Sequence, residues 1–156
     1  MTDDLIFVRL DHTAPAVSEE VSALLRRSYA IEAELISVED FPPLRRTAED
    51  VRETPSTFIG CTSENRLVAV AELEPDGEHV NIAGFVVHPD DFRRGIGSRL
   101  LHHVLESYQR RSITVSTAAA NGPAISLYER HGFSISNRWA IDGIDMVTLN
   151  FSPSGA

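Results

Sequence analysis

A short loop in the second half of the sequence has the residues needed to hold an anion. Residues 86–101 read VVHPDDFRRGIGSRLL: an apolar run, a proline, a polar loop with two glycines, and the start of a helical pattern. Glycines let backbone N–H groups approach a ligand, and the first amides of a helix point at the same place. A tight turn without a ligand is the alternative explanation. The candidate pyrophosphate-binding residues are Arg93, Arg94, Gly95, Ile96, Gly97 and Ser98.

Two common nucleotide-binding motifs are excluded at named positions. A dinucleotide fingerprint needs a third glycine three residues after Gly97, where Leu100 stands, and an acidic residue about twenty positions further on. No Asp or Glu occurs between Glu106 and Glu129. A phosphate loop of the Walker type needs a lysine, but all 14 basic residues are arginine. The lack of lysine also excludes Schiff-base chemistry and a lysine general base.

A second motif follows about 25 residues downstream. Residues 120–133 read ANGPAISLYERHGF, with a tyrosine seven positions after an asparagine. By itself this spacing also fits a tyrosine in the core, one helical turn after Ile125. Together, the two motifs resemble the GNAT family of N-acetyltransferases over residues 58–151. The two amino-terminal helices agree with that family in their order only.

The resemblance implies a role for each matching residue. The loop amides would hold the pyrophosphate of acetyl-CoA, the cosubstrate. Phe85, Val86 and Val87 would form a strand that splays from its neighbour and pairs its backbone with the pantetheine arm. Asn121 would contact the cofactor, and Tyr128 would lie beside the thioester sulfur as the general acid. The reaction implied is direct attack by a primary amine on acetyl-CoA in a ternary complex.

The chain departs from the family pattern at three places. Phe92 stands where the family usually has Gln or Arg, and Asp90 and Asp91 bring negative charge beside the proposed phosphate site, offset by the loop arginines. Ser116 stands five residues before the asparagine, where the family often carries a glutamate as base. Phe92 and Ser116 are the features that give weight to the alternative function, a non-catalytic acyl-CoA-binding sensor or regulatory module.

Three candidates remain for the group that deprotonates the amine. Glu72 continues the face of Val68 and Val70 and would point inward, unless the strand end turns to solvent. His88 precedes a proline and either relays a proton or caps the turn. Water is the third candidate. His102 and His103 are adjacent on a helix, so they face different directions, and no metal site is expected.

Composition limits the class of protein and of partner. The chain has 156 residues and a formal net charge of −9, which predicts one domain (1–156) and argues against nucleic acid as a partner. The charge suits a cationic small-molecule or peptide amine, although it equally serves solubility. No stretch predicts a signal peptide or a membrane span. Cys61, the single cysteine, fits a buried structural thiol in a reducing cytoplasm.

Periodicity and turn residues predict the elements that position these groups. Strands are expected at 5–10, 57–61, 66–74, 79–88, 112–118, 134–140 and 145–151, and helices from Ser18, from Thr47, after the glycine loop, and from Pro123 to Gly132. The order β-α-α-β-β-β-α-β-α-β-β predicts a GNAT-like mixed α/β domain. Its mostly antiparallel sheet would be flanked by helices, with one parallel β-α-β crossover. The acceptor would enter between 38–46 and 134–149. Exposed terminal strands could pair two chains as a homodimer.

Overall fold

The predicted order of elements is confirmed by a computed structural model, which describes residues 4–92, 94–109 and 111–153. The bounds are β1 (Leu5–Leu10), α1 (Pro15–Leu35), η1 (Pro42–Arg45, a 3₁₀ helix), α2 (Ala48–Glu53), β2 (Thr57–Ser63), β3 (Arg66–Asp76), β4 (His79–Val87), η2 (Pro89–Asp91, also 3₁₀), α3 (Ile96–Ser107), β5 (Ser112–Ala118), α4 (Gly122–Arg130), β6 (Ser134–Ile141) and β7 (Ile144–Phe151).

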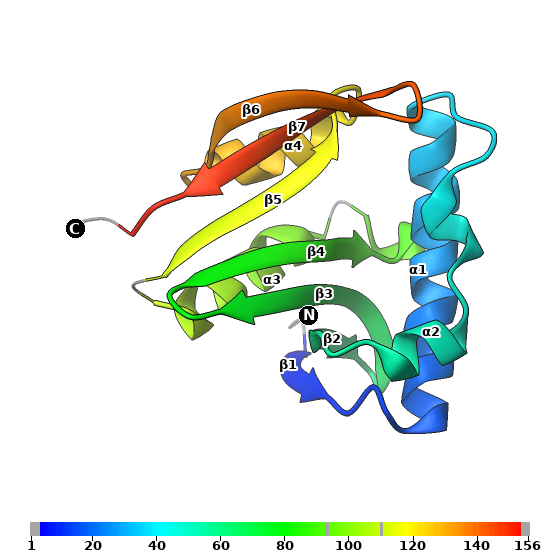
Figure 1. Cartoon of the computed structure of the whole chain (residues 1–156). Helices are drawn as coiled ribbons and strands as arrows, with labels where there is room; N and C mark the ends of the chain where they lie inside the picture. The colour runs from blue at the N-terminus through cyan, green and yellow to red at the C-terminus, as the bar shows by residue number, and fades with distance from the viewer. Residues whose placement is uncertain (1–3, 93, 110, 154–156) are drawn as a thin grey trace.

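The seven strands of the described residues form one sheet, in the order β1-β2-β3-β4-β5-β7-β6 (Figure 1). Every neighbouring pair is antiparallel except β4 and β5, which run parallel because α3 returns the chain between them. The tight turns use left-handed residues where the sequence predicted them, with φ of 64° at Asn65, 62° at Gly77 and 79° at Gly143. The mixed, mostly antiparallel fold class is therefore correct.

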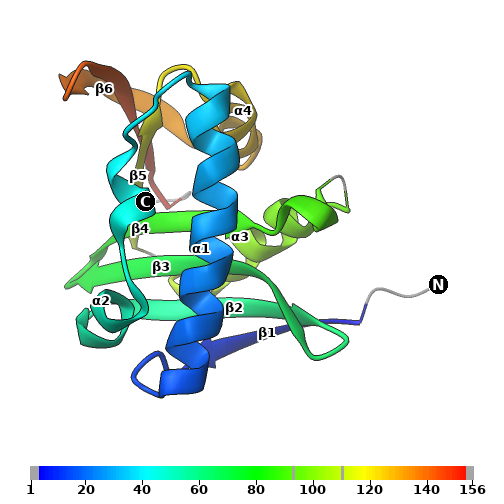
Figure 2. The same ribbon diagram turned by 90° about the vertical axis from the view of Figure 1, so that its right-hand side faces the viewer.

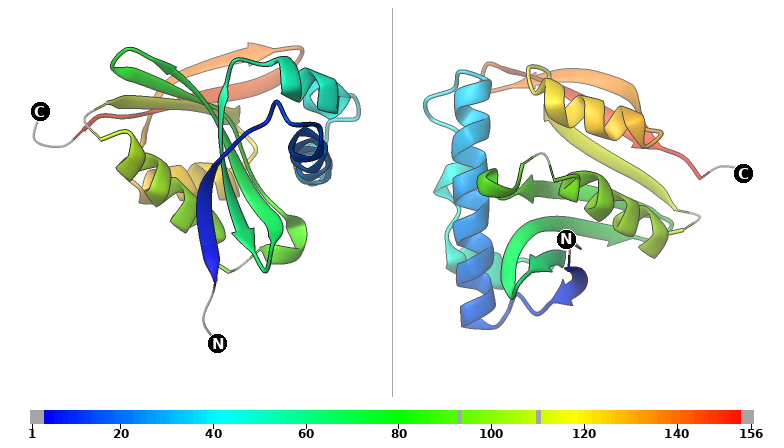
Figure 3. Two further views of the ribbon diagram at one scale, coloured as in Figure 1. Left: turned by 90° about the horizontal axis from the view of Figure 1, so that it is seen from below. Right: turned by 180° about the vertical axis from the view of Figure 1, so that it is seen from behind.

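Two helices cover each face of the sheet (Figures 2 and 3). On one face, α1 and α2 bury Val21, Leu25 and Val51 against Phe58 and Val70. On the other face, α3 and α4 lie over a larger apolar cluster. The sequence stripe along α3 supplies its inner surface, which consists of Ile96, Leu100, Leu101 and Val104.

Helix α1 is longer than the sequence pattern predicted. It begins at Pro15, three residues before Ser18, because proline is well suited to the first helical position. Its 21 residues run across the sheet to Leu35 (Figure 2). Tyr29 packs against the edge of the apolar cluster, and Glu32 follows one turn later. The predicted capping box of α2 is present, with Asp50 N–H donating to Thr47 Oγ1 at 3.1 Å.

Strands β4 and β5 are paired over only part of their length. His79–Ile82 pairs with Ser112–Val115, and no pair follows, although β4 continues to Val87 and β5 to Ala118. Beyond that point β4 stays paired with β3, and β5 with β7, so the two strands diverge (Figure 1). The splay leaves one edge of 83–87 without a neighbouring strand.

The edge strands of the sheet are β1 and β6. Pairing of two chains through these edges stays a prediction. Within the described part of the chain, no helix combines the length and the apolar character that crossing a bilayer requires.

Candidate active site

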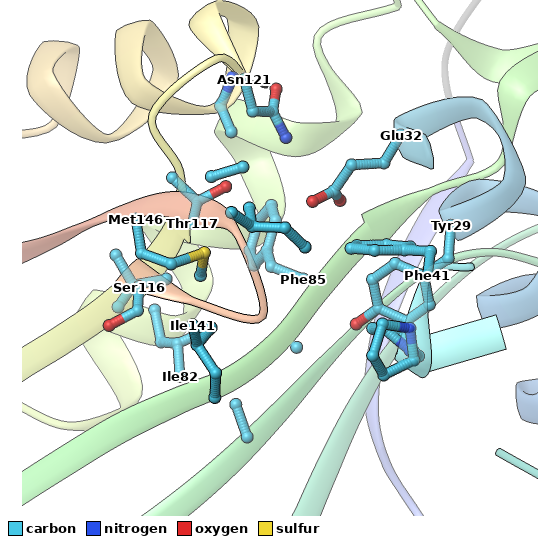
Figure 4. A pocket seen from close by; sticks show the side chains of 18 of the residues that line it. Tyr29, Glu32, Phe41, Ile82, Phe85, Ser116, Thr117, Asn121, Ile141 and Met146 are labelled. Carbon is cyan, nitrogen blue, oxygen red and sulfur yellow. Dashed lines mark hydrogen bonds between the residues drawn. The ribbon is translucent and has the colours of Figure 1, made fainter. Parts of the chain in front are cut away.

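A cavity of ≈ 350 Å³ occupies the divergence of β4 and β5 (Figure 4). One wall comes from α1 and the segment after it, and the other from β5, α4 and the β6–β7 turn. Most of the lining is apolar. The lining residues include Tyr29, Glu32, Phe41, Pro42, Ile82, Phe85, Val115, Ser116, Thr117, Asn121, Tyr128, Ile141, Asp142, Ile144 and Met146.

Tyr128 reaches this cavity from α4. Its ring packs edge-on against Phe85, at 6.0 Å between centroids, and against Phe133 at 5.6 Å. The residue is only 3% exposed. Burial raises the pKa of its phenol above the ordinary value, and the nearby Tyr29 and Glu32 raise it further. Tyr128 therefore keeps its proton at neutral pH, as a general acid must.

Asn121 has a defined orientation at the start of α4. Its Oδ1 accepts a hydrogen bond from Ala124 N–H at 3.3 Å and caps the helix. The amide group is then left with its N–H donors to offer, and the side chain interacts with Glu32 across the cavity. Asn121 thus serves both the helix and the cavity, and seven residues later α4 places Tyr128 in the same space.

Glu32 is the cavity residue that the sequence analysis missed. Burial raises the pKa of its carboxyl group above the usual value, while the Asn121 side chain opposes that rise. A signal was present in the sequence. Glu32 lies three residues after Tyr29 and seven after Leu25, so it continues the apolar stripe of α1 with an acid.

The glycine loop lies next to the cavity, beyond the end of β4. Gly95 adopts a left-handed conformation (φ 73°) as the N-cap of α3, so the following amides begin the helix without intrahelical acceptors. A Cβ built on Gly97 would lie 3.6 Å from Val87 Cγ2 and 4.0 Å from Phe85 Cε1. The loop amides and the cavity therefore adjoin through Phe85. Arg93 lies outside the described residues.

Asp91 does not place an uncompensated charge beside the loop. It is 3% exposed and accepts hydrogen bonds from Arg66, at 3.0 and 3.2 Å, and from Arg94. Burial opposes its ionisation, but the two guanidinium groups outweigh burial and lower the pKa of the carboxyl group. Asp91 anchors the loop to β3. Of the loop arginines predicted to hold pyrophosphate, Arg94 is committed at least partly to this ion pair.

We expect Asp91→Asn to destabilise the protein by about 1–3 kcal/mol at pH 7, since it leaves two guanidinium groups without their carboxylate. Because the pKa of Asp91 is lowered in the folded protein, its carboxylate stabilises the fold above the unfolded pKa of about 3.9, and this stabilisation is lost as the pH falls through the folded pKa. The stability difference between Asp91→Asn and wild type should therefore shrink in strong acid. Urea denaturation at pH 7 and in strong acid measures this difference. The matched control is Asp90→Asn, an exposed neighbour. Equal stability of the two variants at pH 7 would contradict the anchoring role.

Neither side chain proposed as the base lines the cavity. Glu72 points inward and is only 4% exposed, so the solvent-facing alternative is wrong, but both its oxygens accept from Arg46. His88 caps η2, because its Nδ1 accepts from Asp90 N–H at 3.1 Å. Ser116 does line the cavity, with its hydroxyl 2.7 Å from Thr148 Oγ1.

The predicted cofactor strand divides its side chains between the two faces of the sheet. Phe85 lines the cavity, Val86 is buried under α1, and Val87 packs against the α3 cluster. These side chains point to the faces of the sheet, so the open edge of β4 presents backbone groups. Cys61 is fully buried, as expected of a structural thiol, and burial raises its pKa to about 11.

Comparison with known proteins gives consistent matches. Residues 19–133 match the acetyltransferase (GNAT) family. The UPF0157 protein YqkA of Bacillus subtilis is 34% identical over 125 residues, which cover 80% of this chain and 36% of YqkA. The [ribosomal protein bS18]-alanine N-acetyltransferase of Salmonella typhimurium is 32% identical over 76 residues, covering 47% of this chain and 51% of that enzyme. The chain therefore spans only about a third to a half of these curated relatives.

Solved structures share the fold over nearly the whole chain. The ribosomal-protein-S18-alanine N-acetyltransferase of Escherichia coli has a TM-score of 0.77 at 20% identity, covering 97% of this chain and 96% of that one. The PaiA N-acetyltransferase of Thermoplasma acidophilum, solved with coenzyme A, has a TM-score of 0.78 at 12% identity, covering 97% and 99%. At these identities the similarity shows the fold alone.

Proposed function

Because the chain belongs to the GNAT family of acetyltransferases, whose cosubstrate is acetyl-CoA, we propose that it transfers the acetyl group to a primary amine. One observation carries the proposal. A single cavity in the β4–β5 splay brings Phe85, Asn121 and Tyr128 together, beside the glycine-rich start of α3.

The cosubstrate would bind along the open edge of β4. Among the described residues, 83–87 have no partner strand on the β5 side. Apart from the Val87 carbonyl, which accepts from Ser28 Oγ at 3.1 Å, backbone donors and acceptors on that side would be available to an extended amide-containing arm. The amides of Ile96, Gly97 and Ser98, with the positive end of the α3 dipole, would hold the pyrophosphate. Asn121 would offer its N–H donors from the opposite wall.

Direct attack by the amine in a ternary complex accounts for the chemistry. A backbone N–H near Val87 would stabilise the charge that develops on the thioester oxygen. Tyr128 would protonate the departing thiolate. A covalent acetyl-enzyme on cysteine is disfavoured, because Cys61 is buried and its raised pKa keeps the thiol protonated. The buried free thiol and the cosubstrate both suit the cytoplasm, where we place the reaction.

The acceptor would enter from the side opposite the loop, between Phe41 and Pro42 on one wall and the β6–β7 turn at Ile141 on the other. These side chains favour an apolar group next to the amine. The similarity to alanine N-acetyltransferases adds the amino terminus of a peptide to the acceptors worth testing.

Release of coenzyme A, measured over a panel of small amines and peptides with free amino termini, tests the proposal. Turnover with at least one acceptor is expected. The second candidate function is an acyl-CoA sensor. It is supported by Ser116, which stands in place of the family's glutamate, and by Phe92, which is 49% exposed in the loop. Tight binding of acetyl-CoA by calorimetry without turnover on any amine would favour the sensor and contradict the transferase.

A further inference from the structure

The cavity has one carboxylate on the wall that faces Asn121. Among the described lining residues only Glu32 and Asp142 are acids. Asp142 lies at the exposed tip of the β6–β7 turn, at φ 50°. Glu32, in contrast, is partly buried in the last turn of α1 and reaches into the cavity, as Figure 4 shows. A carboxylate in this place is costly to desolvate unless a polar or cationic group meets it.

The groups around Glu32 leave its carboxylate without a matching positive charge. Facing it are the Asn121 amide and the phenols of Tyr29 and Tyr128. Further along lies the Glu72–Arg46 pair beside Tyr29, in which both Arg46 nitrogens donate to Glu72. None of the ion pairs formed among the described residues includes Glu32. The side chain is therefore available to a cation that enters the cavity.

We propose that Glu32 binds the ammonium group of the acceptor and removes the proton that must leave before attack. The inference rests on the proposed transferase function. It assigns the role that neither Glu72 nor His88 can fill, and it places the base on α1, across the cavity from Ser116. The acceptor that fits is a primary ammonium carried on an apolar carbon skeleton, because Phe41, Pro42 and Ile141 border the same space.

The protons and bonds balance as follows. Glu32 takes one proton from R–NH₃⁺, and the nitrogen lone pair then forms the C–N bond to the thioester carbonyl carbon. The C–S bond breaks with its electrons on sulfur, which takes the phenolic proton of Tyr128. The second proton lost from nitrogen restores the phenol, directly or through water. Glu32 releases its proton to solvent, so the products are the N-acetyl amine, coenzyme A as the thiol, and one H⁺.

The location of Glu32 favours this role. A carboxyl group whose pKa is raised by burial is a stronger base once ionised, and that pKa lies closer to neutral pH than the pKa of an exposed carboxyl group. The low-pH limb of kcat/KM in wild type should therefore lie above the range of an exposed glutamate, at about 4.3. The ionised form is the active one, so activity rises with pH through this limb.

The test compares Glu32→Gln with Glu34→Gln, an exposed glutamate two residues along α1 and outside the cavity. With an ordinary alkylamine at pH 7, Glu32→Gln should lower kcat by about 10²- to 10⁴-fold and lose the low-pH limb. The loss should shrink along a series of acceptors of falling pKa, which are already neutral at that pH. Glu34→Gln should behave as wild type, and Glu32→Asp should recover part of the activity.

A second readout needs no turnover. Carbon-13 NMR titration of the Glu32 carboxyl group in the ligand-free protein should give a pKa above the usual value, and calorimetry should find acetyl-CoA affinity unchanged in Glu32→Gln. Wild-type kcat in Glu32→Gln would overturn the inference while leaving the transferase intact. A raised acceptor KM with unchanged kcat would limit Glu32 to binding and overturn its role as base. An inactive wild type would overturn the proposed function itself.

Discussion

Replacing Tyr128 with phenylalanine is expected to lower kcat by about 10²- to 10⁴-fold while the affinity for acetyl-CoA changes little. The substitution keeps the ring that packs against Phe85 and Phe133 and removes only the phenolic hydroxyl group, the proton donor. If Tyr128 were merely a core residue, the loss would instead be about 1 kcal/mol of stability from one hydrogen bond, with normal turnover. Steady-state kinetics under rate-limiting chemistry, together with thermal denaturation, separate these outcomes.

The pH profile provides an independent check on Tyr128. Burial raises its phenol pKa, so the protonated, active form persists beyond the ordinary value of about 10. No decline in kcat from this group is expected below that pH, and the high-pH limb should change in Tyr128→Phe. The matched control is Tyr108→Phe at the end of α3, outside the cavity. A Tyr128→Phe enzyme as fast as this control would contradict the assignment.

Gly97→Asp is expected to abolish binding of acetyl-CoA in a protein that still folds. A Cβ at Gly97 would meet Leu127 at 3.5 Å and Val87 at 3.6 Å, which are ordinary contact distances. An aspartate in the first turn also interacts favourably with the helix dipole. The carboxylate would, however, face the pyrophosphate. Two unit charges about 4 Å apart near a protein surface repel by about 4 kcal/mol, or roughly a thousandfold in Kd.

The matched variant Gly97→Asn separates charge from bulk. It has nearly the same size without the charge, so calorimetry should show a weaker loss than with aspartate. Circular dichroism and thermal denaturation confirm folding of each variant. If folded Gly97→Asp bound acetyl-CoA as tightly as wild type, the start of α3 would not be the pyrophosphate site. Equal losses in both variants would indicate steric obstruction instead.

The elements could be predicted from the sequence because each has a local signal. Alternating apolar residues indicate the strands, the stripe from Ile96 to Val104 indicates α3, and Gly77 and Gly143 indicate turns. The order of strands in the sheet has no such signal. That β7 inserts between β5 and β6 is decided by long-range packing and backbone pairing, as is the point at which β4 and β5 part.

The site was only partly predictable for the same reason. Asn121 and Tyr128 share one helix, so their spacing in the sequence fixes their spacing in space, and the family resemblance indicated their roles. Glu32 lies about 90 residues away on α1 and meets them only because the helix crosses the divergent strands. The ion pair of Glu72 with Arg46 argues against Glu72 as the base. It likewise joins two segments that no local sequence pattern relates.

The four-residue ladder between β4 and β5 also bears on how the protein responds to its ligand. In the part of the chain that the structure describes, strand pairing joins β1–β4 to β5–β7 through His79–Ile82 and Ser112–Val115 alone. The apolar cluster under α3 and α4 supports this junction. Amide protons at the open ends of these strands should therefore exchange fastest in the ligand-free state. A cosubstrate bound along β4 would supply backbone hydrogen bonds where β5 does not pair, and would couple the unfolding of β1–β4 to that of β5–β7. The melting temperature should therefore rise with the cosubstrate concentration.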